Sequence, residues 1–150
     1  GPNTLTRAER EMIASYVSAQ NDCYFCHASH RAAAANHLEG DYALVDAVRD
    51  NPESAEITPK LKALLSIAGK VSRSGLEVTT ADIDRARAQG ATDVEIHDTV
   101  LIAAAFCMFN RYVDGLATLT PTDEDMYDLM GKRMAFQGYI PAELETVSTG

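Results

Sequence analysis

The sequence lacks an apolar run long enough to cross a membrane. The best candidate, Val100 to Phe109, has ten residues, whereas a membrane-spanning helix needs about 20. Positive charge is also scarce, because 13 lysines and arginines stand against 22 aspartates and glutamates and leave a net charge of -9. An acidic chain of this kind is poorly suited to nucleic acids and to anionic lipid surfaces. We therefore expect neither a nucleic acid nor a membrane as a partner.

Cysteine is too rare for a disulfide-stabilised secreted fold, since the chain has only three. An odd and small number favours a reducing compartment, and we expect the protein to be cytoplasmic. No signal peptide is visible at the start. Gly1-Pro2 without an initiator Met is typical of a tag remnant, so residues 1–4 are interpreted as a remnant with a flexible start.

Alternating apolar and polar residues, the pattern of exposed strands, are missing as well. The 150 residues, 46% hydrophobic and 23% charged, suit one globular domain with its own core. Helical periodicity recurs along the chain, with no internal repeat. We predict a single all-α domain over 1–150 with six or seven helices and a polar tail from 137, the helices covering approximately 6–19, 23–39, 42–49, 59–71, 80–90, 93–116 and 123–136.

Local start signals define several of these helices. Thr6 and Glu9 form one capping-box pattern, and Thr92 and Glu95 form another. Thr58-Pro59 combines a good N-cap with proline at the first helical position. These signals fix where the helices begin.

The helix that begins after Thr92 is apolar around most of its circumference from Val100 to Phe109. A helix of that kind is expected to be buried on all sides. Either a second subunit covers part of this helix, or it is the central helix of a monomer. Composition alone favours neither alternative over the other. We expect a homo-oligomer and interpret Cys107, on this helix, as a small core residue.

The segment Asp22-Cys-Tyr-Phe-Cys-His-Ala-Ser-His30 is the densest group of reactive side chains in the sequence. In a helix, Cys23, Cys26, His27 and His30 stand at i, i+3, i+4 and i+7, which is one face. Asp22 is a good N-cap, so we expect the helix to begin at or next to Cys23. Both thiols and both imidazoles then point the same way.

Thiols at such a helix start are expected to be reactive. The unpaired N–H groups and the dipole of a helix N-terminus favour anions, and a neighbouring imidazolium adds to the effect. Cys23 and Cys26, one turn apart, have Cα atoms roughly 5 to 6 Å from each other, within reach of a disulfide. The pair is therefore able to cycle between dithiol and disulfide.

Three chemistries compete for this cluster. Cys23-Tyr-Phe-Cys26-His27 fits the C-x-x-C-H pattern of covalent haem attachment, with His27 as axial ligand. A metal site would need further ligands, because Cys23 to His30 extends about 10 Å along one helix. A redox dithiol served by a histidine base needs neither a haem nor further metal ligands. A thioredoxin-type fold is not indicated, because the sequence around the pair has no βαβ pattern. We favour the redox dithiol, with no resident cofactor and no metal.

Glu11, the Cys23-x-x-Cys26 pair and His30 together resemble the alkylhydroperoxidase D-like branch of the carboxymuconolactone decarboxylase family. The segments 5–21 and 109–115 are similar to the flanking pattern of its peroxidase-related members, so the resemblance covers most of residues 5–136. Periodicity alone predicts a solvated Glu11, opposite the apolar stripe of the first helix. The resemblance instead implies that Glu11 faces the cysteine helix.

The resemblance implies a dithiol peroxidase that acts on hydroperoxides. Cys26 would be the peroxidatic cysteine and Cys23 the resolving one, and an external dithiol or dithiol protein would reduce their disulfide. His30 would be the base, oriented by Glu11, with His27 as a possible accessory. The family resemblance also implies a homotrimer or homohexamer. A non-peroxidatic enzyme or a redox-sensing protein on the same scaffold is the alternative.

Phe25 departs from the pattern of the founding peroxidases, which carry an additional histidine between the two cysteines. The proton relay implied for this chain is correspondingly shorter. His27 does not stand at the matching position.

Overall fold

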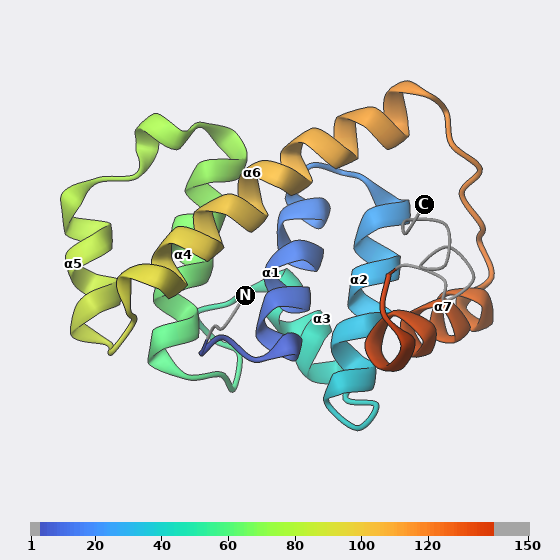
Figure 1. Ribbon diagram of the computed structural model, residues 1–150, viewed down its shortest axis with the longest axis horizontal. Coiled ribbons are helices and arrows are strands. Elements are labelled where there is room, and N and C mark those ends of the chain that lie inside the picture. The colour runs from blue at the N-terminus through green and yellow to red at the C-terminus, as the bar shows by residue number, and fades with distance from the viewer. Residues whose placement is uncertain (1–3, 140–150) are drawn as a thin grey trace, which may run out of the picture.

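Seven α-helices and one short 3-10 helix make up residues 4–139, the part of the chain that the computed structural model describes (Figure 1). The predicted tag remnant and tail lie mostly outside this range. The described residues contain no strand, and the predicted all-α fold is confirmed. None of the described helices is long and apolar enough to cross a membrane. The elements are α1 (Arg7–Gln20), α2 (Tyr24–His37), α3 (Tyr42–Asp50), α4 (Pro59–Arg73), η1 (Gly75–Glu77), α5 (Thr80–Ala88), α6 (Asp93–Gly115) and α7 (Glu124–Gln137).

The helix starts follow the local signals. Thr6 and Glu9 form a reciprocal capping box at α1. Thr92 and Glu95 form another at α6. Thr58 accepts the cap hydrogen bond of α4, with Pro59 as the first helical residue. Each cap satisfies backbone N–H groups that the helix itself leaves free.

The turn between α1 and α2 differs from the sequence prediction. Asp22 is not the N-cap of α2; that position belongs to Cys23. Asp22 instead has a positive φ of 57° and its backbone N–H donates to the carbonyl of Ala19. Helices commonly end with such a left-handed residue, which aspartate tolerates better than most. Asp22 therefore terminates α1, and the chain reverses within three residues.

Helix α1 lies in the middle of the fold (Figure 1). It packs against α2, α4 and α6, while α7 covers another side of α2 and α5 packs on α4 at the far end of the molecule. Aliphatic side chains from α1 and α4 fill the main core, among them Ile13, Val17, Leu64, Leu65 and Ile67. This core fixes α1 rigidly, and α1 in turn supports the cysteine helix.

Helix α6 runs across the molecule over α4 and α1 and is not buried on all sides within one chain (Figure 1). Leu101, Met108 and Tyr112 are 57%, 59% and 66% exposed. A single layer of neighbouring helices covers only one face of a helix, which explains the difference from the sequence prediction. Cys107 is partly buried and packs against the core, as expected.

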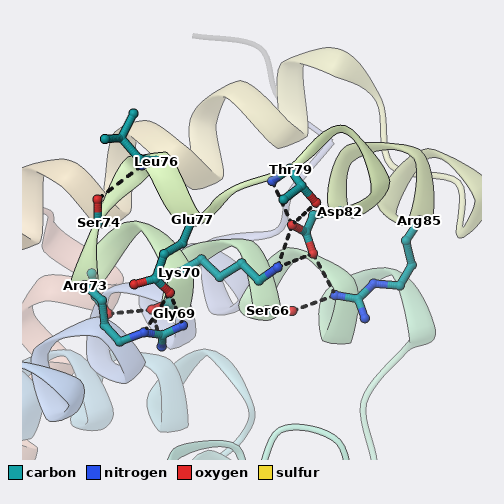
Figure 2. Close-up of polar contacts among 11 residues, drawn as sticks. Ser66, Gly69, Lys70, Arg73, Ser74, Leu76, Glu77, Thr79, Asp82 and Arg85 are labelled. Carbon is teal, nitrogen blue, oxygen red and sulfur yellow. Dashed lines mark hydrogen bonds and ion pairs between the residues drawn. The ribbon is translucent and has the colours of Figure 1, made fainter.

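A polar network joins α4, η1 and α5 (Figure 2). These elements lie at the end of the molecule away from α2 (Figure 1). Lys70 Nζ donates to both oxygens of the buried Asp82 at 2.7 and 2.6 Å. Thr79 donates to Asp82 through its backbone N–H and its hydroxyl. The hydrogen bonds from Lys70 and Thr79 hold the pKa of Asp82 well below its usual range. Figure 2 also shows Arg73 reaching Glu77, which fastens η1 to α4.

Helix α7 approaches α2 so closely that only glycine fits at one position. A Cβ on Gly131 would lie 2.5 Å from Ala32 Cβ and 2.6 Å from the Ala32 carbonyl carbon. The run of four alanines from Ala32 to Ala35 is buried. Small residues on both helices therefore let α7 form a wall beside the cysteine helix.

Candidate active site

The two thiols of the C-x-x-C pair are buried at the start of α2. Cys23, the N-cap, is 1% exposed, and Cys26, the third residue of the helix, is 6% exposed. Both are free thiols. Cys26 thus lies in the first helical turn, where unpaired N–H groups and the helix dipole stabilise negative charge.

His30 and Glu11 form a hydrogen-bonded pair across α1 and α2. The Nδ1 atom of His30 lies 2.7 Å from Oε2 of Glu11. A carboxylate only accepts hydrogen bonds, so Nδ1 carries the proton and Nε2 is left as the basic nitrogen. The ring also packs edge-on against Phe106, with centroids 4.5 Å apart. The imidazole is therefore fixed in position and in tautomer.

Glu11 is buried, contrary to the periodicity of α1 and in agreement with the family resemblance. Its second oxygen accepts a hydrogen bond from the hydroxyl of Tyr139, which follows α7. Burial raises the pKa of Glu11. The hydrogen bond from His30, its electrostatic attraction and the hydrogen bond from Tyr139 outweigh burial and lower the pKa overall. The carboxylate is consequently held in its charged form.

His27 contacts a different residue of α1. Its Nδ1 lies 3.1 Å from the carbonyl oxygen and 3.0 Å from the hydroxyl of Ser15. Burial lowers the pKa of His27, so the ring is neutral at neutral pH. Glu11 and Ser15 stand one turn apart on α1, so both imidazoles of α2 face that helix, each with its own partner.

Cys23 has a partner that the sequence interpretation missed. Its Sγ–H donates to Oδ1 of Asp114 in the last turn of α6, at 3.2 Å. Burial raises the pKa of Cys23 to about 12, and Asp114 acts in the same direction, whereas the backbone amide of Cys26 opposes it. Cys23 is therefore a protonated thiol at neutral pH. The only sequence signal for Asp114 was its place in the 109–115 segment.

Asn110 anchors the same end of α6 to the loop before α2. It is 1% exposed, and its side chain donates to Ser18 Oγ at 3.0 Å and accepts from Asn21 Nδ2 at 2.9 Å. The Cys23 backbone N–H donates to the Ser18 carbonyl. These contacts hold α6 in register with the cysteine loop.

Two hollows adjoin the cysteine helix. A cavity of about 740 Å³ is lined by Cys23 and His27 together with Tyr24, Arg31, Tyr42 and Tyr127. A second hollow of about 550 Å³ is lined by Glu11, Phe106, His37 and Tyr139 among others. The first is large enough for a small organic molecule.

No three histidine, cysteine or acidic side chains within residues 4–139 are grouped in a way that would hold a metal ion. The thiols of Cys23 and Cys26 are buried in the fold, and the His27 ring is packed on Ser15. Covalent attachment of a haem would require both sulfurs and that ring at an open surface. The geometry of this segment therefore does not suit covalent haem attachment.

These features define a class: an all-helical protein with a C-x-x-C pair at a helix N-terminus, next to a glutamate–histidine pair. Two solved structures share the fold. A peroxidase-related protein from Silicibacter sp. TM1040 superposes with a TM-score of 0.75 and 31% identity, over 85% of this chain and 65% of that one. An alkylhydroperoxidase AhpD core protein from Ralstonia eutropha JMP134 superposes with a TM-score of 0.77 and 32% identity, over 88% and 67%. No family model and no curated protein matches.

The chain therefore belongs to the alkylhydroperoxidase D-like family, as the sequence resemblance predicted. It spans about two thirds of the length of these two relatives. Both are described as uncharacterized peroxidase-related proteins.

Proposed function

We propose that this protein is a thiol-dependent peroxidase that reduces hydroperoxides through Cys23 and Cys26. The observation that carries the proposal is the Glu11–His30 hydrogen bond at 2.7 Å, one helical turn from Cys26. It supplies a base with a defined tautomer next to a thiol in the first turn of a helix. The peroxidase-related relatives support the same reaction class.

In the first step His30 takes the proton of the Cys26 thiol. The thiolate attacks one oxygen of the peroxide, an S–O bond forms and the O–O bond breaks. Sulfur is oxidised to a sulfenic acid while the hydroperoxide is reduced to an alcohol, whose oxygen receives the proton from His30. The negative charge of Glu11 stabilises His30 while it is protonated.

In the second step Cys23 attacks the sulfur of oxidised Cys26 and water leaves. The product is a Cys23–Cys26 disulfide, which an external dithiol or dithiol protein reduces by exchange. The cycle needs no resident cofactor. The cavity beside Cys23 and His27 is the route by which we expect small reactants to reach the pair.

We also propose a homotrimer or homohexamer working in a reducing compartment such as the cytoplasm. Large apolar side chains of α6 and α7 are exposed on the single chain, including Leu101, Met108, Leu129 and Phe136. Subunit contacts would bury them. Light scattering at several protein concentrations tests the assembly.

Steady-state reduction of an organic hydroperoxide with a dithiol donor tests the activity. The parent is compared with Cys23→Ser, Cys26→Ser and His30→Gln. We expect Cys26→Ser to abolish turnover, Cys23→Ser to stop after one oxidation, and His30→Gln to lose about 100-fold or more. Turnover by Cys26→Ser at the parent rate would refute the mechanism.

The same assay separates peroxidase activity from redox sensing on this scaffold. A sensor would form the Cys23–Cys26 disulfide with peroxide, with a loss of two free thiols, but would not turn over with any dithiol. A peroxidase shows both disulfide formation and continued consumption.

A further inference from the structure

The buried thiol of Cys23 is hydrogen-bonded to a carboxylate of another helix. The thiol is 1% exposed, and its proton points at Oδ1 of Asp114 at 3.2 Å. Asp114 itself is exposed at the end of α6. This carboxylate therefore has one end on a buried thiol and the other in water.

The placement of Asp114 is supported by contacts on either side. One turn earlier on α6, Asn110 is hydrogen-bonded to Ser18 and Asn21, which come just before Cys23 in the chain. Asn21 Nδ2 also reaches Cys107 Sγ at 3.5 Å. Cys107, Asn110 and Asp114 stand at i, i+3 and i+7, so one stripe of α6 faces this loop. Any shift of α6 that moved Asp114 away would break these contacts.

The second chemical step creates a need for a proton acceptor at this point. Cys23 must lose its proton before its sulfur attacks Cys26, yet a buried thiol keeps that proton at neutral pH. His30 is hydrogen-bonded to Glu11 on α1. The group in contact with the Cys23 proton is Asp114.

We propose that Asp114 is a catalytic residue that accepts the proton of Cys23 when Cys23 resolves oxidised Cys26. This inference rests on the proposed function. The Cys23 S–H bond breaks and its proton passes to Asp114, while the sulfur lone pair forms the S–S bond and the S–O bond of the sulfenic acid breaks. The proton continues from Asp114 to solvent, and the departing hydroxide is protonated there, so a sulfenic acid and a thiol give a disulfide and one water.

The electrostatics around Cys23 agree with this role. Burial and the neighbouring carboxylate of Asp114 both raise the pKa of Cys23. Cys23 is therefore not a thiolate in the resting protein. Cys23 is thereby kept from competing with Cys26 for the peroxide, and it is deprotonated only when the S–S bond forms.

The resolution step is measurable without peroxide. In a Cys107→Ala background, Cys26 attacks 4,4′-dithiodipyridine and releases one coloured thione, and Cys23 then displaces the second thione as the internal disulfide forms. We expect Asp114→Asn to leave the first phase unchanged and to slow the second about 100-fold or more, since about 100-fold is the low end of general base effects. Asp114→Glu, which keeps a carboxylate, should recover much of the second phase.

Alkylation of Cys23 by iodoacetamide, in Cys26→Ser/Cys107→Ala, separates proton acceptance from simple packing. Asp114→Asn removes the negative charge, so Cys23 should alkylate as fast as in the parent or faster. Asp22→Asn is the matched control, because it removes a carboxylate adjacent to Cys23 at a left-handed position that asparagine tolerates. This control should retain the second thione phase.

A second phase in Asp114→Asn as fast as in the parent would overturn the proposal. A parallel fall in alkylation and thione release would do so too, since it would mean that Asp114 only positions the loop. If the parent resolves dithiodipyridine quickly but does not consume hydroperoxide, the peroxidase assignment fails while the role of Asp114 stands.

Discussion

The Glu11 carboxylate accepts a hydrogen bond from Nδ1 of His30 at 2.7 Å, although the two residues belong to different helices. This contact orients the imidazole of His30, which the proposed mechanism uses as its base. It also explains why a charged residue is buried on the side of α1 that faces α2.

Replacing Glu11 with glutamine should slow the reaction of Cys26 with peroxide. The amide keeps the volume of the side chain but removes the negative charge that supports a protonated His30. General acid–base catalysis contributes about 10²- to 10⁴-fold, so we expect a loss of about tenfold or more in the rate constant. Stopped-flow measurement with an organic hydroperoxide gives this value. Glu56→Gln, at an exposed loop position, serves as the control, and an equal rate in both variants would contradict the relay.

Tyr139→Phe should make the proposed peroxidase activity more sensitive to acid. The variant keeps the ring but removes the hydroxyl that donates to Glu11. The lowered pKa of Glu11 depends partly on that donor, so its pKa should rise and the loss of activity on acidification should begin at a higher pH. A pH profile of the peroxide rate constant checks this shift. Tyr112→Phe, on the exposed face of α6, should leave the acid limb in place; a matching shift there would argue against a specific role for Tyr139.

Glu95 should make stability depend on pH in a predictable direction. Burial raises the pKa of Glu95, but hydrogen bonds from Lys60, Thr4 and Thr92 outweigh it and lower the pKa from 4.5 to about 2. A carboxyl group with a lowered folded-state pKa stabilises the fold above its unfolded pKa, and the contribution disappears as pH falls through the folded value. Stability should therefore decline between about pH 5 and pH 2.

Urea denaturation of Glu95→Gln tests this expectation. Hydrogen bonds to a charged group contribute about 1.5 to 3 kcal/mol, so the variant should lose about 2 kcal/mol of unfolding free energy at neutral pH. The difference from the parent should shrink as the pH is lowered. A constant difference at every pH would show that the charge of Glu95 is not responsible.

Gly131→Ala should loosen the contact between α7 and α2. The new Cβ would meet Ala32 Cβ at 2.5 Å and the backbone of Ala33 at 2.8 Å, and overpacking of this kind costs about 1 to 3 kcal/mol. Gly115→Ala is a helical control with no heavy atom within 4 Å of the added Cβ. Urea midpoints compare the two variants, and equal stability would mean that α7 yields without cost.

Much of the secondary structure was predictable, because its signals are local. Thr6 with Glu9 and Thr92 with Glu95 form capping boxes from residues three apart. Thr58 before Pro59 acts in the same way at α4. Asp22 is an exception: aspartate is a good N-cap, but the turn between α1 and α2 requires a residue with positive φ, and Asp22 takes that position at the end of α1.

The candidate site was predicted only in part. The sequence by itself determined the spacing that puts Cys23, Cys26, His27 and His30 on one helix face, because helical geometry relates residues three and four apart. Glu11 came from the family resemblance. Periodicity of the first helix alone predicts that Glu11 faces solvent. The predicted roles of these residues stay predictions until the assays above are done.

Only the tertiary structure decided which partner each reactive side chain has. Asp114 and Asn110 reach the cysteine loop from α6, about 90 positions further along the chain, and no periodicity within one helix carries that information. The tertiary structure also determines which face of α6 is exposed, because the neighbouring helices within one subunit cover only one side of it. Sequence fixes which groups share a face, whereas packing between helices determines what that face touches and where its protons can go.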